Sequence, residues 1–180
     1  MTTDSIKKAI PSLTTPRLLL REIIETDRPS IYAGLSDPKV IQYYGIHFES
    51  LEATKEQMVW FADPKQAWWA VCSHDNQTFY GAGGLNNVTN EHNKAEIGFW
   101  LLPEYWGQGI MAEAMPLICN YGFKELKLHR IEGLVETHNH NCKKAMAKLN
   151  FEYEGTMRDC EVKKGKRISL DMYALLDVRW

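Results

Sequence analysis

The residues with the clearest chemical potential form a short loop that contains two glycines. The segment from Pro103 to Ala114 reads P-E-Y-W-G-Q-G-I-M-A-E-A, and Gly107 and Gly109 stand just before a helical pattern. Glycine lets backbone N–H groups approach a ligand closely, and the start of a helix favours anions. The loop therefore suits a pyrophosphate, although two glycines alone also fit a turn that only starts a helix.

The loop differs from the two common nucleotide-binding motifs. A third glycine at the spacing of G-x-G-x-x-G is missing, and no Gly-Lys-Ser or Gly-Lys-Thr follows. Both motifs need these residues to hold phosphates with backbone N–H groups. The sequence therefore disfavours a nucleotide-binding fold.

One carboxylate lies inside the apolar segment A-E-I-G-F-W-L-L that precedes the loop. Strand alternation places Glu96 on the same face as Gly98 and Trp100. A carboxylate at this place can act as a base through a water molecule, and it can equally be a solvated strand residue. Glu96 is the candidate base.

The patterns around these residues predict an alternation of strands and helices. Apolar runs bounded by turn residues predict strands at 17–23, 68–73, 79–86, 95–102, 130–135, 151–157 and 168–175. Helical spacing or start signals occur from 26 to about 35, at 37–38, from 109 to 122 and from 142 to 149. Pro116 interrupts the third helical pattern, where a missing N–H and a ring clash cost about 3 kcal/mol or force a bend.

Several motifs in a fixed order resemble one enzyme family. These are T-P-R-L-L-L-R, A-E-I-G-F-W-L, Y-W-G-Q-G-I-M-A-E-A, F-E-Y-E-G-T-M-R and D-M-Y-A-L-L, which together extend from Thr15 to the end of the chain. The set resembles the GNAT acetyltransferases, and W-G-x-G followed by E-A resembles their RimJ/RimL branch. Trp106 stands where the family has Gln or Arg, and Met111 where it has a small residue.

The resemblance implies a mixed α/β fold with a mostly antiparallel, twisted sheet of about seven strands. Helices are expected on both faces, with a V-shaped split between the fourth and fifth strands. We expect a single domain over residues 1–180, with residues 1–13 flexible. The family's cosubstrate, acetyl-CoA, would lie in the split.

The resemblance also implies which residues hold acetyl-CoA. Backbone groups of the fourth strand would bind pantetheine, and the loop with the helix start would bind the pyrophosphate. Asn139, in H-N-H-N-C-K-K-A-M-A-K-L-N-F, takes the position of a family asparagine that often contacts the cofactor. The expected cofactor-binding residues are Phe99, Trp100, Leu101, Trp106, Gly107, Gln108, Gly109, Ile110, Met111 and Asn139.

Cys142 falls where this branch often has a serine that protonates the leaving thiolate. Met146 falls where other branches have a tyrosine for that task, and methionine has no proton to donate. Cys142 or a water molecule is then the proton source. Cys142 also lies on the apolar stripe of its helix, so it can equally be a buried hydrophobe. A backbone N–H near Trp100 or Leu101 is the expected oxyanion donor.

The composition excludes other classes. The formal net charge of −2 gives no basic surface for nucleic acid. No apolar run reaches the roughly 18 residues of a membrane span, and no signal peptide is evident, so we expect a cytoplasmic protein. Four scattered cysteines fit reduced thiols, and His138 with His140 is weak evidence for a metal, so none is expected.

The sequence thus predicts an acetyl-CoA-dependent N-acetyltransferase that acts on a primary amine. Relatives in this branch acetylate N-terminal amines of proteins, so a protein α-amine is the first choice of acceptor. Alternatives are a small amine, such as a polyamine, amino sugar or antibiotic, and a CoA-binding module without catalysis. A homodimer is left open.

Overall fold

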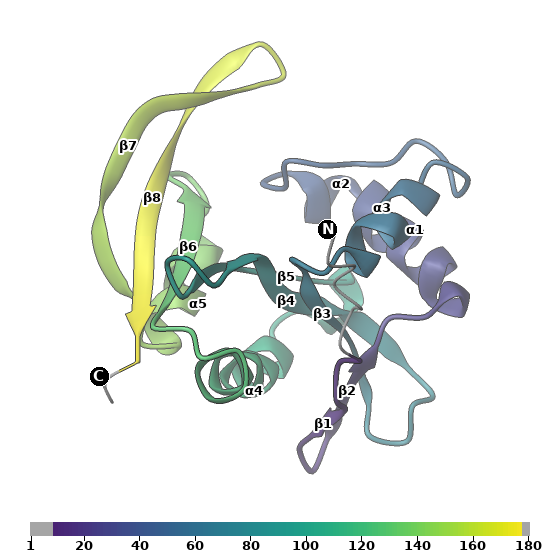
Figure 1. Cartoon of the computed structure of the whole chain (residues 1–180). Helices are drawn as coiled ribbons and strands as arrows, with labels where there is room; N and C mark the ends of the chain where they lie inside the picture. The colour runs from purple at the N-terminus through teal and green to yellow at the C-terminus, as the bar shows by residue number, and fades with distance from the viewer. Residues whose placement is uncertain (1–8, 178–180) are drawn as a thin grey trace, which may run out of the picture.

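A computed structural model describes residues 9–177, and one eight-stranded sheet runs through this part of the chain (Figure 1). The strand order is β1-β2-β3-β4-β5-β6-β8-β7, and all neighbours are antiparallel except β5 and β6. The strands are β1 (Leu13–Thr14), β2 (Leu18–Glu22), β3 (Ala67–Ser73), β4 (Phe79–Thr89), β5 (Lys94–Leu101), β6 (Arg130–Glu136), β7 (Glu152–Lys163) and β8 (Lys166–Leu176).

Helices cover both faces of the sheet, as predicted. The α-helices are α1 (Arg28–Ser36), α2 (Pro38–Ile41), α3 (Lys55–Ala62), α4 (Ile110–Lys124) and α5 (His140–Lys148), with 3₁₀ turns η1 (Glu25–Asp27) and η2 (Pro103–Tyr105). On one face, Ile31 and Phe61 of the first helices pack with Trp68 and Trp100. On the other face, α4 and α5 pack against a larger buried cluster that includes Ile118 and Met146.

The sheet is split where β5 and β6 part. Only Lys94, Ala95 and Glu96 of β5 pair with β6, opposite Arg130, Ile131 and Glu132. Beyond this point β5 stays paired with β4, while β6 stays paired with β8. These are the fourth and fifth strands of the sequence-based prediction, so the predicted V-shaped split is confirmed.

The structure has more strand than the sequence indicated. The eighth strand is β1, which has two residues and pairs with Leu19 and Leu20. The sixth predicted strand ended at 157, whereas β7 continues to Lys163 as a long hairpin with β8 (Figure 1). Most β7 residues are exposed, so no buried apolar pattern marks its far half, and pairing with β8 holds it extended.

The beginning of the described chain packs against the sheet. Ile10 and Leu13 contact the larger core cluster, and the Trp69 indole N–H donates to the Pro11 carbonyl at 2.9 Å. Residues 1–8 lie outside the described residues. The expectation of a flexible segment over residues 1–13 thus does not fit Ile10, Pro11 and Leu13, which have these contacts. For residues 1–8, flexibility stays a prediction.

Pro116 lies inside α4 without ending the helix. Its position is exposed, and so is Ala112, whose carbonyl would have received the missing N–H. Water can satisfy that carbonyl on the outer face, which removes part of the cost of proline in a helix. Among the described residues, no helix is long and apolar enough to span a membrane.

Candidate functional site

The glycine loop enters α4 through two left-handed residues. Gly107 has φ 75° and Gly109 has φ 77°, a region that glycine occupies without the strain of a Cβ. Gly109 is the N-cap of α4, and no side chain caps the first turn of that helix. The N–H groups at the start of α4 therefore have no side-chain cap. Binding of a pyrophosphate by Gly107, Gln108, Gly109, Ile110 and Met111 stays a prediction.

Arg17, the residue immediately before β2, forms contacts that hold this loop in place. The Arg17 Nε donates to Glu113 in the first turn of α4 at 2.7 Å, and its Nη1 donates to the Gln108 carbonyl at 3.3 Å. The Thr15 hydroxyl also donates to Glu113. A Cβ on Gly109 would lie 3.8 Å from Arg17 Nη2, so a positive charge stands next to the loop. No sequence spacing indicates this role, because Arg17 lies far from the loop in the chain.

The edge of β5 that faces the split has no strand partner from Ile97 to Leu101 among the described residues. This edge contains Phe99, Trp100 and Leu101, the expected pantetheine-binding residues. The Leu101 carbonyl is already used, because the Trp106 indole N–H donates to it at 2.9 Å. Trp106 thus closes the turn from β5 into the loop, and its cofactor contact stays a prediction.

Glu96 lies at the last paired position of β5, directly opposite Glu132 on β6. Its face of β5 is the face of Gly98 and Trp100, which is covered by the first three helices. Burial raises the pKa of the Glu96 carboxyl, and the negative charges of Glu132 and Glu161 raise it further. A carboxyl with a raised pKa is suited to take up a proton near neutral pH.

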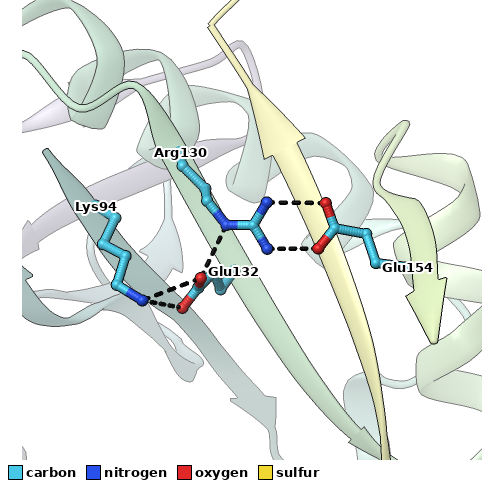
Figure 2. Close-up of polar contacts among 4 residues, drawn as sticks. All are labelled: Lys94, Arg130, Glu132 and Glu154. Carbon is cyan, nitrogen blue, oxygen red and sulfur yellow. Dashed lines mark hydrogen bonds and ion pairs between the residues drawn. The ribbon is translucent and has the colours of Figure 1, made fainter. Parts of the chain in front are cut away.

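A network of four charged residues joins the strands at the closed end of the split (Figure 2). Lys94 donates to Glu132 at 3.1 Å, and Arg130 donates to the same carboxylate at 2.8 Å. Arg130 also forms two hydrogen bonds to Glu154 of β7, at 2.8 and 2.6 Å. Burial works against the charge of Glu132, but the two cations outweigh it and the pKa of Glu132 lies below its ordinary value. Glu132 therefore stays negative beside Glu96.

The start of α5 holds two of the predicted residues. Asn139 is the N-cap, and its side-chain oxygen accepts the Cys142 N–H at 3.1 Å. Asn139 thus has a structural role, and its cofactor contact stays a prediction. Burial raises the pKa of the Cys142 thiol to about 11, so the thiol is neutral at physiological pH. Met146 is buried in the core.

The four cysteines lie in the described part of the chain, and none of them forms a disulfide there. Across residues 9–177, no group of three histidine, cysteine, aspartate or glutamate side chains gathers at metal-binding distance. The His138 carbonyl accepts a hydrogen bond from the Tyr43 hydroxyl at 3.3 Å. This contact joins the segment after α2 to the loop before α5.

The match to a family model decides the identity of this arrangement. Residues 17–152 match the model described as the acetyltransferase (GNAT) domain, which includes the loop, Glu96 and Cys142. The chain belongs to the GNAT acetyltransferase family. The split sheet, the uncapped start of α4 and the mostly antiparallel topology are those expected of a GNAT enzyme.

Similar proteins agree with this assignment. The chain is 30% identical over 174 residues to the uncharacterized N-acetyltransferase YoaA of Bacillus subtilis (strain 168), covering 94% of this chain and 98% of that protein. It is 32% identical over 100 residues to the putative ribosomal N-acetyltransferase YdaF of the same organism, covering 56% and 55%. The fold is similar to spermidine N-acetyltransferase of Vibrio cholerae in complex with CoA and spermine, with TM-score 0.81, 20% identity and coverage of 90% and 96%.

Proposed function

We propose that this GNAT enzyme transfers an acetyl group from acetyl-CoA to a primary amine and that it is of the RimJ/RimL type. The observation that carries this proposal is the unpaired edge of β5, which leads directly into the uncapped start of α4. An extended pantetheine chain suits a strand edge, and a pyrophosphate suits free N–H groups at a helix start. Acetyl-CoA has these two parts in this order.

The described residues fit that cosubstrate. Backbone groups of Phe99 would face the pantetheine, because the register with β4 turns those of Trp100 toward Ala82. The residues from Gly107 to Met111 would face the pyrophosphate. The left-handed conformation of Gly109 leaves its N–H and those that follow without a side-chain cap. When bound, acetyl-CoA supplies an activated acetyl group as a thioester.

The catalytic roles follow from the groups around the split. Glu96 takes the proton from the acceptor amine through a water molecule, aided by its raised pKa. A backbone N–H near Trp100 or Leu101 stabilises the oxyanion, and of the two the Leu101 N–H is the one that the register with β4 leaves on the side of the split. Cys142 stands at the chain position where the family pattern often has the residue that protonates the leaving sulfur, so this pattern suggests either its thiol or a water molecule as the donor.

The acceptor that we propose first is an N-terminal α-amine of a protein, of the ribosomal-protein type. Support comes from the RimJ/RimL-type motifs and from the similarity to YdaF. A small polyamine is the second candidate, supported by the likeness in fold to a spermidine N-acetyltransferase. The segment from Gly34 to Phe61, which packs over the Glu96 face, would shape the acceptor pocket.

Release of free thiol from acetyl-CoA tests the transfer. The assay uses a panel of N-terminal peptides, spermidine, amino sugars and aminoglycosides. We expect amine-dependent thiol release with at least one class, together with the acetylated amine by mass spectrometry. Tight acetyl-CoA binding with no release for any amine would favour a CoA-binding module without catalysis.

A negative charge added to the loop tests the cosubstrate site. Gly109→Glu should weaken acetyl-CoA binding by more than about 100-fold in calorimetry, because it adds a negative charge where the pyrophosphate is expected. Gly165→Glu is a matched control, because Gly165 has a similar φ of 74° in the β7–β8 turn. Equal affinities of both variants and the wild type would overturn the assignment of the loop.

A further inference from the structure

The short segment after α2 is tied to the C-terminal half of the molecule. The Lys163 ammonium donates to the Gln42 carbonyl at 2.7 Å and lies 5.9 Å from the centre of the Tyr43 ring. The same ammonium pairs with Glu136 at the end of β6. The Tyr43 hydroxyl donates to the His138 carbonyl. These contacts fix the two residues that immediately precede Tyr44.

Tyr44 lies between two parts of the proposed site. Its side chain packs against the buried cluster that contains Trp100, on the face of β5 that also has Glu96. Its neighbour Tyr43 contacts His138, the residue before Asn139, which caps the Cys142 N–H. The packing therefore places Tyr44 near β5, and the hydrogen bond places its backbone near the start of α5.

The Tyr44 hydroxyl is free to bind another group. Within residues 9–177 it has no hydrogen-bond partner, although the side chain is half-buried. Burial raises the pKa of Tyr44 above its ordinary value, and the negative charges that Glu96 and Cys142 carry at the high pH where a phenol titrates raise it further. The phenol is therefore neutral and keeps its proton. Both candidate catalytic residues, Glu96 and Cys142, contribute to its raised pKa.

We propose that Tyr44 is a further catalytic residue, whose hydroxyl donates a proton to the sulfur that leaves during acetyl transfer. The role rests on the proposed function. The lone pair of the amine forms the new C–N bond, and the C–S bond breaks with its electron pair on sulfur. The phenol proton passes to that sulfur. The proton lost by the amine passes through water to Glu96, and solvent exchange restores the phenol.

The chemistry of the place favours this donor over the alternatives. Met146 has no acidic proton to donate. Burial raises the pKa of the Cys142 thiol to about 11, so a thiolate is disfavoured in these surroundings. A departing thiolate in the same surroundings is thus a stronger base than in water and can accept a phenol proton. Another phenol near Cys142, that of Tyr173, belongs to the core cluster on the opposite face from Glu96.

Two neighbouring tyrosines provide a matched test. Tyr44→Phe removes a hydroxyl without a partner, so we expect an unchanged melting temperature, an unchanged KM for acetyl-CoA and a kcat lower by about 100-fold. Tyr43→Phe removes the hydrogen bond to His138, so it should keep most of the kcat. An active wild type with the same kcat in Tyr44→Phe would overturn the role of Tyr44 and leave the proposed function intact.

Binding of free CoA gives a second readout that needs no turnover. The pKa of the bound CoA thiol is followed by the ultraviolet absorbance of the thiolate. A phenol that donates to this sulfur stabilises the thiolate, so Tyr44→Phe should raise the pKa of the bound thiol while Tyr43→Phe should not. Identical titrations of the wild type and Tyr44→Phe would overturn the proposal. Absence of thiol release by the wild type with every amine would overturn the proposed function and this role together.

Discussion

At the scale of single residues, the environment of Glu96 predicts a specific pH dependence of the reaction rate. Its pKa is raised by burial and by Glu132 and Glu161, so the carboxylate form appears only above the ordinary pKa of a glutamate. Glu96→Gln should lower kcat about 100-fold at neutral pH and recover as the pH rises, because a base matters most while the amine is protonated. The measurement is kcat/KM from pH 6 to pH 10.

Glu132→Gln is the companion variant for this profile. It removes a negative charge opposite Glu96 but leaves Glu96 in place. The pKa of Glu96 should fall in this variant. The acid limb of its kcat/KM profile should therefore lie at lower pH than the acid limb of the wild type. If Glu96→Gln and the wild type have the same profile, Glu96 is not the base.

Substitutions of Cys142 should affect turnover much less than the substitution of Tyr44. With Tyr44 as the proton donor, Cys142→Ala should keep its turnover per folded molecule and lose about 1 kcal/mol of stability through a small cavity. Cys142→Ser should also keep turnover, with a similar loss from a buried hydroxyl. Rates and thermal melts of both variants check this. A well-folded Cys142→Ala enzyme with a lost rate that serine restores would instead make Cys142 the donor.

At the scale of elements, the brace from Arg17 to α4 should set the affinity for acetyl-CoA. Arg17 holds Glu113 and the Gln108 carbonyl, and its charge lies beside the loop. Arg17→Met should weaken acetyl-CoA binding by about 10-fold, since both the loop geometry and a nearby positive charge are lost. Arg17→Lys should recover little of the lost affinity for acetyl-CoA, because lysine lacks the planar guanidinium group that contacts both Glu113 and the Gln108 carbonyl.

Lys55→Met provides the control for this brace. The Lys55 side chain is 56% exposed and pairs with Glu52, while the Arg17 side chain is 55% exposed. The control removes an equally exposed cation at the start of α3. Calorimetry should show unchanged affinity for Lys55→Met, and a loss of the same size in both variants would assign the effect to net charge.

The elements also show what sequence patterns can predict. Strands with buried apolar runs between turn residues, such as β3 and β5, appeared at the expected positions. The far half of β7 could not be predicted, because its exposed polar residues have no pattern apart from their partner β8. The loop could be found because its glycines and its helix are adjacent in the chain.

Tyr44 and Arg17 could not be assigned roles from the sequence, because their contacts join segments that are distant in the chain. Arg17 appeared only as part of the strand motif T-P-R-L-L-L-R. Tyr44 lies in the region expected to form the acceptor pocket, and no local spacing relates it to Glu96 or Cys142. Such roles follow from tertiary packing.

At the scale of the whole molecule, the charged network in Figure 2 holds the two halves of the sheet together at the closed end of the split. Beyond it, β5 belongs with β4 and the N-terminal half, whereas β6 belongs with β8. Arg130 is the central cation, because it contacts Glu132 on its own strand and Glu154 on β7. The network thus stabilises a sheet that cannot close along its full length.

The stability of this arrangement should depend on pH through its carboxylates. The hydrogen bonds from Arg130 hold the pKa of Glu154 below its ordinary value, and Glu132 is also lowered in spite of its burial. A carboxyl with a depressed pKa adds stability above the ordinary pKa of about 4.3, and this contribution is lost as the pH falls through the folded-state value. Arg130→Met should therefore cost on the order of 2 kcal/mol at pH 7, less than the loss of a fully buried pair, because the Arg130 side chain is 24% exposed.

The difference between the wild type and Arg130→Met should shrink as the pH falls below about 4, because protonated Glu132 and Glu154 no longer need a cation. Urea unfolding between pH 7 and pH 3 measures both free energies of unfolding. Arg167→Met, at an exposed arginine near the turn of the β7–β8 hairpin, is the control for the loss of one positive charge. Its curve should run close to that of the wild type at every pH. If the curves of Arg130→Met and the wild type stay parallel down to pH 3, the ion pairs do not hold the split, and packing across β6 and β8 must do so.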